Sequence, residues 1–477
     1  MKKFAGVALT VVMGVGFLAG CGSGGNEGGA ANAANASGGK NASSGTDSGA
    51  KGDAANGGAE PKIVTISVRE NTWGARKDNF LEAEKRLNED LKAENVQVKL
   101  DWWPGIDDDE LVLQAQAGKV ADVFINSSVD IGWERDAGII RDIDWVKDSG
   151  TFKNVPESYT DIMKYDGHYY GVIQDMDASP VFISRKALEG LGWTADKIDG
   201  LRAQVDGGQF TFGDLVDLAD QAKKKSLVQL GFAVEDTRFE GWNYAFGSYN
   251  YDAASNKLIL SKKAKDVYEF WADAKKRGVI TESIGDVDTD KAAPMFVKGQ
   301  IFAEFARTEF YSMMREANGM KDDIEGYNKW FQDNVVWIPV PSAEKGGKPV
   351  SYSNPAMIFV GSKVDDGKMP YVQRLIEHVM DPDLQVNHTI ASGKLPVTPE
   401  AQDDARFKAM SFYKDHAYMV DFTRTRPALP DYATFTKGYT LGIDAILTKG
   451  KSADEAYGLF KKEVKQNVPA DRVTIEN

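Results

Sequence analysis

The chain has 477 residues, and its composition and charge exclude several classes of protein. Hydrophobic residues make up 42% and charged residues 27%, which is ordinary for a soluble globular body and excludes disorder of the whole chain. One cysteine and four histidines, without a His-Glu-x-x-His motif, exclude disulfides, thiolate metal sites and zincin-type sites at motif level. A net charge of −14 repels phosphate backbones, so we expect no nucleic-acid partner.

The amino terminus has the pattern of a targeting sequence. Lys2 and Lys3 precede an uncharged apolar run over residues 4–20, which is typical of a secretory signal peptide and short for a transmembrane span. The run ends in Leu18-Ala19-Gly20-Cys21, which resembles the lipobox of bacterial lipoproteins. This resemblance implies that residues 1–20 are removed and that Cys21 is lipidated at the outer face of the cell membrane. The alternative is an ordinary leader followed by a stray cysteine.

A linker follows the predicted lipidation site. Residues 21–60 are dominated by Gly, Ala, Ser and Asn, which cannot form a core. Such a linker behaves as a flexible tether with a reach of roughly 35 Å. The fold must therefore lie in residues 61–477.

The folded part opens with an α/β pattern. Residues 62–69 alternate Val64, Ile66 and Val68 as a strand does, and apolar residues then recur at helical spacing over 78–92. A second alternating segment runs from Val96 to Trp102, which predicts a βαβ unit. A capping box at Asp107 and Glu110 predicts a helix through Ala117, and residues 121–125 form a third, buried strand. This order predicts a parallel sheet.

The rest of the chain continues the mixed pattern. Asp166-Gly167 predicts a type I′ hairpin turn within 165–169. The remaining predicted strands are 181–184, 334–341 and 355–360, and the remaining predicted helices are 186–191, 212–224, 262–276, 371–380, 435–447 and 453–464.

Taken in order, several segments resemble motifs of the extracellular solute-binding proteins of ABC importers, in the family that takes up sugars and oligosaccharides. The segments that carry the resemblance are 121–126 (ADVFIN), 137–143 (AGIIRDI), 169–172 (YYGV), 182–188 (FISRKAL), 210–219 (FTFGDLVDLA), 297–302 (VKGQIF), 393–396 (GKLP) and the closing helices within 430–464. The match covers nearly all of residues 61–477.

The resemblance implies an α/β, two-lobed periplasmic-binding-protein-like fold of type II, with a hinge between the lobes. Lobe 1 is expected to comprise 61–178 and 353–402, and lobe 2 to comprise 179–352 and 403–477. It also implies a monomer without catalysis or cofactor that binds a carbohydrate ligand and delivers it to transmembrane permease subunits. The lipid anchor would make the membrane a further partner.

The candidate site residues come from the chemistry of sugars and from the positions at which the resemblance implies ligand contacts. Sugar C–H faces pack on aromatic rings, and their hydroxyls need polar partners, so aromatics and carboxylates in loops after strands are the candidates. Relatives in the family often carry a ligand-stacking Trp where this chain has residues 306–310 (ARTEF), so Arg307 or Glu309 is expected to bind instead, which favours a charged or branched ligand. The full set of predicted ligand-binding residues is Glu70, Trp73, Asn126, Ser127, Asp175, Asp177, Trp242, Arg307, Glu309, Tyr432 and Phe435.

Two other functions remain open from the sequence. An extracellular glycan-acting hydrolase would need a pair of suitably spaced carboxylates, and no spacing in this acidic chain selects one. A ligand-sensing lipoprotein that serves a receptor kinase would have the same cleft as an importer subunit. A calcium loop at 286–290 fails, because Lys291 replaces the required Gly and Val297 the closing Glu.

Overall fold

The computed structural model describes residues 60–70, 74–233, 239–252 and 255–476. The predicted lipidation site Cys21, the predicted signal peptide and the predicted ligand contact Trp73 lie outside these residues. Residues Ala59–Asn477 form one compact unit, which contains all the elements below. Within the described part of the chain, no helix is long and apolar enough to cross a membrane.

A five-stranded sheet in the order β2-β1-β3-β13-β6 contains the predicted opening strands. Its strands are β1 (Lys62–Glu70), β2 (Val96–Pro104), β3 (Val123–Ser127), β6 (Gly171–Asp175) and β13 (Ala356–Val360). β1 pairs in parallel with β2 and β3, as predicted, whereas β13 enters antiparallel between β3 and β6 and makes the sheet mixed. The opening βαβ unit is therefore confirmed, and a strand from much later in the chain completes the sheet.

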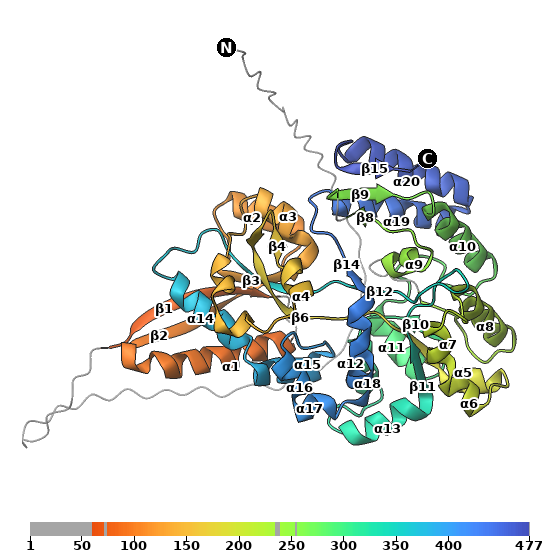
Figure 1. The fold of residues 1–477 in the computed structure, drawn as a ribbon, viewed down its shortest axis with the longest axis horizontal. Helices are drawn as coiled ribbons and strands as arrows, with labels where there is room; N and C mark the ends of the chain where they lie inside the picture. Colours follow the sequence, from red (N-terminus) through yellow and green to blue (C-terminus); the bar gives the residue numbers. More distant parts are fainter. Residues whose placement is uncertain (1–59, 71–73, 234–238, 253–254, 477) are drawn as a thin grey trace, which may run out of the picture. The chain divides into compact units, whose positions relative to one another are not determined.

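Helices pack along this sheet. α1 (Gly74–Asp90) contacts β2 and packs against α14 (Met369–Val379) and α15 (Pro382–Ser392), so segments almost 300 residues apart in sequence lie side by side (Figure 1). The shorter helices of this region are α2 (Asp108–Gln116), α3 (Ile131–Asp136), α4 (Glu157–Ile162), α16 (Pro399–Asp403), α17 (Ala405–Lys408) and α18 (Ser411–His416). Asp107 caps α2 by accepting from the Glu110 backbone N–H, as its sequence pattern predicts.

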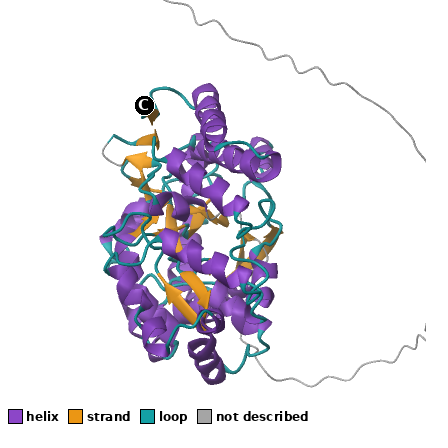
Figure 2. Ribbon diagram, turned by 90° about the vertical axis from the view of Figure 1, so that its right-hand side faces the viewer, coloured by secondary structure: helices purple, strands orange, loops and turns teal. Residues whose placement is uncertain are grey.

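A second, three-stranded sheet has β7 (Val181–Ser184) at its centre, between β10 (Ala303–Phe305) and β11 (Val335–Ile338). Helices lie on both sides of this sheet in Figure 1, and Figure 2 shows the helices and strands of the molecule after a quarter turn. The helices on this side are α5 (Arg185–Gly190), α6 (Ala195–Asp199), α7 (Leu201–Asp206), α8 (Phe212–Lys224), α9 (Phe239–Ala245), α10 (Ala264–Lys276), α11 (Thr289–Val297), α12 (Phe310–Ala317) and α13 (Ile324–Asn334).

The carboxyl-terminal part packs onto α10. α19 (Tyr432–Lys449) and α20 (Ala453–Asn467) contact each other and α10. A small sheet of β8 (Tyr251–Asp252), β9 (Lys257–Leu260) and β15 (Val473–Ile475) lies beside them (Figure 1). The predicted hairpin is also confirmed: β4 (Lys164–Tyr165) and β5 (His168–Tyr169) are joined by Asp166 and Gly167 at φ angles of 49° and 84°.

Three chain segments meet between the two large sheets. β12 (Ser351–Ser353) pairs in parallel with β14 (Thr423–Thr425) (Figure 1). The Ser179 backbone N–H donates to Ser351 Oγ at 2.9 Å, which brings the link between β6 and β7 to the same place. The predicted lobe boundaries at 178/179 and 352/353 fall in these segments, and the bounds of the lobes stay a prediction.

Three predicted ligand contacts lie in the hydrophobic core. Trp242, Tyr432 and Phe435 are 3%, 2% and 1% exposed. The ring of Trp242 stacks on Trp271 at 4.6 Å, and the Phe435 ring meets Phe460 edge-on at 5.0 Å. The prediction that these three residues stack on ligand is wrong for this conformation, because the core covers their rings.

Candidate ligand-binding site

The predicted polar residues at the strand ends lie along one edge of the five-stranded sheet. Glu70, Ser127 and Asp175 are the last residues of β1, β3 and β6. Ala356 of β13 pairs with both Ser127 and Asp175, so the ends of β3 and β6 flank the same point. Parallel alignment of β1 with β3 places Glu70 at this edge too. The topology thus brings together side chains that are far apart in sequence.

Asp175 lies in the first part of a buried ion network. Its Oδ2 is 2.8 Å from Nε2 of His388, on α15, and 3.4 Å from Nη2 of Arg76, on α1. Arg76 also approaches Glu70 at 3.5 Å. Burial would raise the pKa of Asp175, but Arg76, His388 and Lys394 together outweigh burial and lower it to about 2. Asp175 is therefore a carboxylate at neutral pH.

Asp177 is the centre of the second part. It is 1% exposed, and Lys394 Nζ lies 2.8 Å from its Oδ2, while the Ser353 hydroxyl donates to Oδ1 at 2.6 Å. The Asn354 backbone N–H adds a donor at 3.2 Å, and Arg307 Nη1 lies 3.9 Å away. Burial acts to raise the pKa of Asp177, and Lys394 and Arg307 outweigh it, so the pKa is lowered.

Glu309 extends this network to the wall of a cavity. Its Oε1 is 2.7 Å from Nη2 of Arg307, and its other oxygen contacts Nζ of Lys394. Burial raises its pKa less than these two cations lower it, and the result is about 2. Arg307 and Glu309 come from the link between β10 and α12, so the network spans both large sheets.

The turn after α15 positions Lys394. Gly393 ends the helix with φ of 78°, and a Cβ there would lie 2.8 Å from Cα of Glu309. Leu395 then forms an isolated bridge with Met176, between the two aspartates. Only glycine satisfies both the backbone angle and the close approach, and this geometry places the Lys394 ammonium beside Asp177.

The two predicted residues at the end of β3 are engaged within the protein. Asn126 Nδ2 donates to Oε1 of Glu134 at 2.9 Å, and the Ser127 hydroxyl donates to Oδ1 of Asn354. Glu134 is 0% exposed, and burial together with the nearby charge of Asp130 raises its pKa well above the usual value. Burial also raises the pKa of Asp130, to about 6. The pKa values of the carboxyls beside the end of β3 are thus raised, whereas those of Asp175 and Asp177 are lowered.

A cavity of about 500 Å³ borders the network. It is lined from four places: the start of α11, the β10–α12 link, α12 with Lys321, and the end of α15. Its lining residues are Asp288, Thr289, Asp290, Arg307, Glu309, Ser312, Met313, Arg315, Glu316, Lys321, Ala391 and Ser392. No aromatic ring is among these described residues, so the wall offers charged groups and hydroxyls rather than a stacking surface.

A second cavity of about 430 Å³ does carry aromatic rings. Tyr165 of β4 and Tyr251 of β8 line it, together with Ser128, which follows β3. Residues 425–429 also line it. This cavity lies close to the predicted residue Ser127 and offers the aromatic surface that the first cavity lacks.

The structure thus joins seven of the predicted site residues into adjoining polar clusters: Glu70, Asn126, Ser127, Asp175, Asp177, Arg307 and Glu309. Sequence reasoning missed Arg76, His388, Lys394 and Arg315. Lys394 had a usable signal, since it is the one charged residue in the Gly-Lys-Leu-Pro turn that carries the family resemblance. The other three come from helices and had no distinguishing local pattern. Among the described residues, no group of three His, Cys, Asp or Glu side chains could hold a metal ion.

Comparisons with known proteins place the chain in a family. The family model described as bacterial extracellular solute-binding protein matches residues 88–415, which is more than half of the chain. No curated protein matches the sequence of this chain.

Solved structures share the fold at low sequence identity. Maltose-bound MalE3 of T. maritima has a TM-score of 0.68 at 18% identity, over 85% of this chain and 99% of that protein. An ABC transporter solute-binding protein from Thermotoga lettingae TMO, bound with alpha-D-tagatose, has a TM-score of 0.67 at 16% identity, over 86% and 100%. The GacH receptor of Streptomyces glaucescens, solved unliganded and with acarbose, has a TM-score of 0.66 at 14% identity, over 86% and 99%. With a two-lobed α/β fold in common with these proteins and a family match over most of its folded part, this chain belongs to the bacterial extracellular solute-binding proteins.

Proposed function

We propose that this protein is the membrane-anchored solute-binding subunit of an ABC importer and that it captures a sugar or an oligosaccharide. The proteins that share its fold were solved with maltose, alpha-D-tagatose and acarbose, which supports a carbohydrate ligand. Their matches cover essentially their whole length, so the shared fold extends over the whole of those proteins.

The observation that carries the proposal is the cavity at the edge of the charged network. Its volume of about 500 Å³ lies within the range of small-molecule sites, roughly 300–1,000 Å³. Arg307 and Glu309 hold each other in fixed positions at its wall, so they present donors and acceptors to sugar hydroxyls without having to be ordered first. Preorganised polar groups of this kind supply specificity.

The electrostatics favour binding over hydrolysis. A glycosidase needs a carboxylic acid that stays protonated near neutral pH to protonate the leaving oxygen. Glu309, the carboxylate of the network that reaches the cavity, has a pKa of about 2 because two cations contact it. Glu134, whose pKa is raised, is fully buried against Asn126. We therefore propose that the protein does no chemistry on its ligand.

Anchoring and delivery complete the proposal. Lipidated Cys21 would hold the protein at the membrane, and residues 22–60 would tether the folded part close to permease subunits. Closure would occur about the segments that meet at Ser179, β12 and β14, because few chain crossings connect the two large sheets there.

Calorimetric titration tests the ligand class. We expect at least one member of a panel of mono- and oligosaccharides to bind, while a peptide panel does not. Glu309→Gln should weaken binding about tenfold or more, because it removes the charge that fixes Arg307. The control Glu282→Gln changes an exposed glutamate that pairs only loosely with Lys275, at 3.7 Å, and should leave affinity unchanged. Turnover of glycans, or binding of peptides alone, would overturn the proposal.

Fractionation of cells tests the anchor. The protein should sediment with membranes, and Cys21→Ser should release it into the soluble fraction. Retention of Cys21→Ser on membranes would contradict lipid anchoring without touching the proposed ligand.

A further inference from the structure

The cavity at the network contains a buried cation whose charge is not compensated. Arg315, on α12, is 6% exposed and lines the cavity. Its Nη2 donates to the Ile390 carbonyl at 3.3 Å, while Nε and Nη1 have no hydrogen-bond partner among the described residues. None of the described carboxylates forms an ion pair with it, and the helix end that holds Ile390 offers only about half a negative charge.

The cations of the buried network are paired, whereas Lys321, which also lines the cavity, is exposed. Arg76 faces Glu70 and Asp175, Lys394 faces Asp177 and Glu309, and Arg307 faces Glu309. Among the described residues, Arg315 is therefore the buried cation at this cavity that forms no ion pair. Its aromatic neighbours Tyr311 and Tyr413 are phenols with raised pKa values, which are neutral and supply no counter-charge.

An anion bound in the cavity would compensate the charge of the unpaired guanidinium. Arginine does not lose its proton in proteins, so burial cannot be relieved by neutralisation. Leaving such a charge unpaired is costly, and a carboxylate that enters the cavity would offset the cost. Four acidic residues also line the cavity: Asp288, Asp290, Glu309 and Glu316. Glu309 already faces Arg307 and Lys394, Asp288 pairs with Lys291, and Asp290 and Glu316 are exposed and screened by solvent.

We propose that the solute is an acidic sugar and that a uronate carboxylate binds against Arg315. This inference rests on the proposed function and specifies its substrate class. One unpaired guanidinium matches one negative charge, and its planar fork fits a carboxylate in two-point contact. The hydroxyls of Ser312 and Ser392, which line the same cavity, are placed to serve the neighbouring sugar oxygens. The absence of aromatic rings from the described lining residues fits recognition by charge.

Matched ligand pairs test the inference on the unaltered protein. We would titrate di- and trigalacturonate, and glucuronate-substituted xylo-oligosaccharides, against the same compounds with methyl-esterified carboxyl groups. Esterification keeps the shape and removes the charge. At least one free acid should bind about tenfold or more tighter than its ester. If acids and esters bind equally, or if sulfated or phosphorylated sugars bind tighter than uronates, the carboxylate assignment is overturned and the proposed sugar-binding function stands.

Variants locate the carboxylate. Arg315→Gln should weaken binding of the free acid about tenfold to hundredfold and leave the ester unchanged, while Arg315→Lys should retain part of the preference. Arg86→Gln, which changes a surface arginine on α1, is the control and should behave like the parent. Equal loss of acid and ester binding in Arg315→Gln would overturn the role of Arg315. If no sugar of either kind binds the parent protein, the proposed function itself fails.

Thermal unfolding without ligand gives an independent readout. Because Arg315 is an uncompensated buried charge, the ligand-free Arg315→Met variant should unfold at a higher temperature than the parent. A lower unfolding temperature would mean that the protein itself already compensates this charge, and the inference would fall.

Discussion

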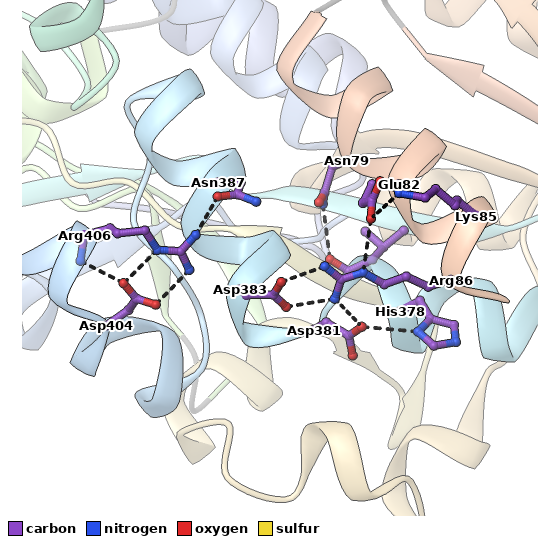
Figure 3. A network of polar contacts seen from close by, with 11 residues as sticks. Asn79, Glu82, Lys85, Arg86, His378, Asp381, Asp383, Asn387, Asp404 and Arg406 are labelled. Atoms are coloured by element: carbon purple, nitrogen blue, oxygen red, sulfur yellow. Dashed lines mark hydrogen bonds and ion pairs between the residues drawn. The ribbon is translucent and has the colours of Figure 1, made fainter. Parts of the chain in front are cut away.

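The network around Asp177 and the network around Arg86 use the same side-chain chemistry in different surroundings. In the first, the side chains of Asp177 and Lys394 are 1% and 4% exposed. In the second, Arg86 on α1 reaches Asp381 and Asp383 at 3.1 and 2.6 Å, and these side chains are 30%, 34% and 49% exposed (Figure 3). Both networks join segments distant in sequence, so geometry alone does not distinguish them.

The difference in solvent exposure shows which of the two networks fixes the local structure through its charges. Water screens the surface network, and such pairs contribute about 0–1 kcal/mol each. In the buried network Asp175, Asp177 and Lys394 are almost fully shielded from water, so each depends on its partners, and removal of one leaves another uncompensated. The surface network therefore tolerates change, while the buried one enforces a fixed arrangement at the cavity.

Removing the central cation should have the largest effect. Lys394→Met leaves Asp177 and Glu309 with Arg307 alone, so we expect a loss of about 3–5 kcal/mol in the free energy of unfolding. The matched control is Lys408→Met, whose lysine pairs at the surface with Asp403 at 2.9 Å. It should cost about 0–1 kcal/mol. Equal costs in denaturant titrations would remove the distinction between the two kinds of network.

Protonation of Asp175 at low pH should have the second largest effect, because it breaks ion pairs of the buried network. The pKa of Asp175 in the folded protein, about 2, lies below the unfolded value of about 3.9. Its contribution is therefore complete above about pH 4 and is lost as the pH falls toward 2, at a cost on the order of 2 kcal/mol.

High salt should affect the pKa of Asp175 differently from that of Asp404, its counterpart at the surface. Contacts with Arg406 also lower the pKa of Asp404 to about 2, but that pair is solvent-exposed. In 1 M salt, where screening acts over about 3 Å, the pKa of Asp404 should rise while that of Asp175 stays low. Carboxyl NMR titrations assigned with Asp175→Asn and Asp404→Asn would measure both, and parallel shifts would contradict the contrast.

Glu134 should have a smaller effect on the free energy of unfolding, with a pH dependence opposite in sign to that of Asp175. Its folded pKa is raised by burial, so the folded protein holds a proton that the unfolded chain releases above about pH 4.3. The free energy of unfolding therefore falls as the pH rises above that value. Glu134→Gln should remove this loss and stabilise the protein by about 1–3 kcal/mol at pH 7.5, with no gain at pH 4. Destabilisation at pH 7.5 would indicate that the carboxyl is ionised and paired.

The smallest effect is expected at the surface. Arg86→Gln should cost about 0–1 kcal/mol in low salt and nearly nothing in 1 M salt, as measured by urea unfolding. A cost of several kcal/mol that persists in high salt would show that the network of Figure 3 acts like the buried one.

Much of the fold follows from local pattern. The alternation of Val64, Ile66 and Val68 predicted β1, and the Asp166-Gly167 pair predicted the hairpin, because side-chain period and positive φ angles are properties of short segments. Placement of Glu70 and Ser127 at one sheet edge also follows, since parallel strands bring their carboxyl ends together, whereas Asp175 reaches that edge because β13 pairs with both β3 and β6.

The aromatic assignments failed for a physical reason. Trp242 lies in a turn-rich stretch that suggested an exposed ring, yet helix α9 turns it onto Trp271. The residues next to a tryptophan in the sequence do not determine whether its ring packs in the core or contacts a ligand. It depends on which surfaces the fold leaves uncovered.

The sequence by itself determined the succession of strands and helices, the family and the acidic residues at the strand ends, because these depend on local periodicity and motif order. Only the tertiary structure decided which carboxylates are buried and which cations form ion pairs with them. Lys394 meets Asp177 because Gly393 turns the chain there, and Arg315 remains without a carboxylate because of the way α12 packs against the end of α15. Burial and charge balance depend on contacts between distant segments, and those contacts come into being only when the chain folds.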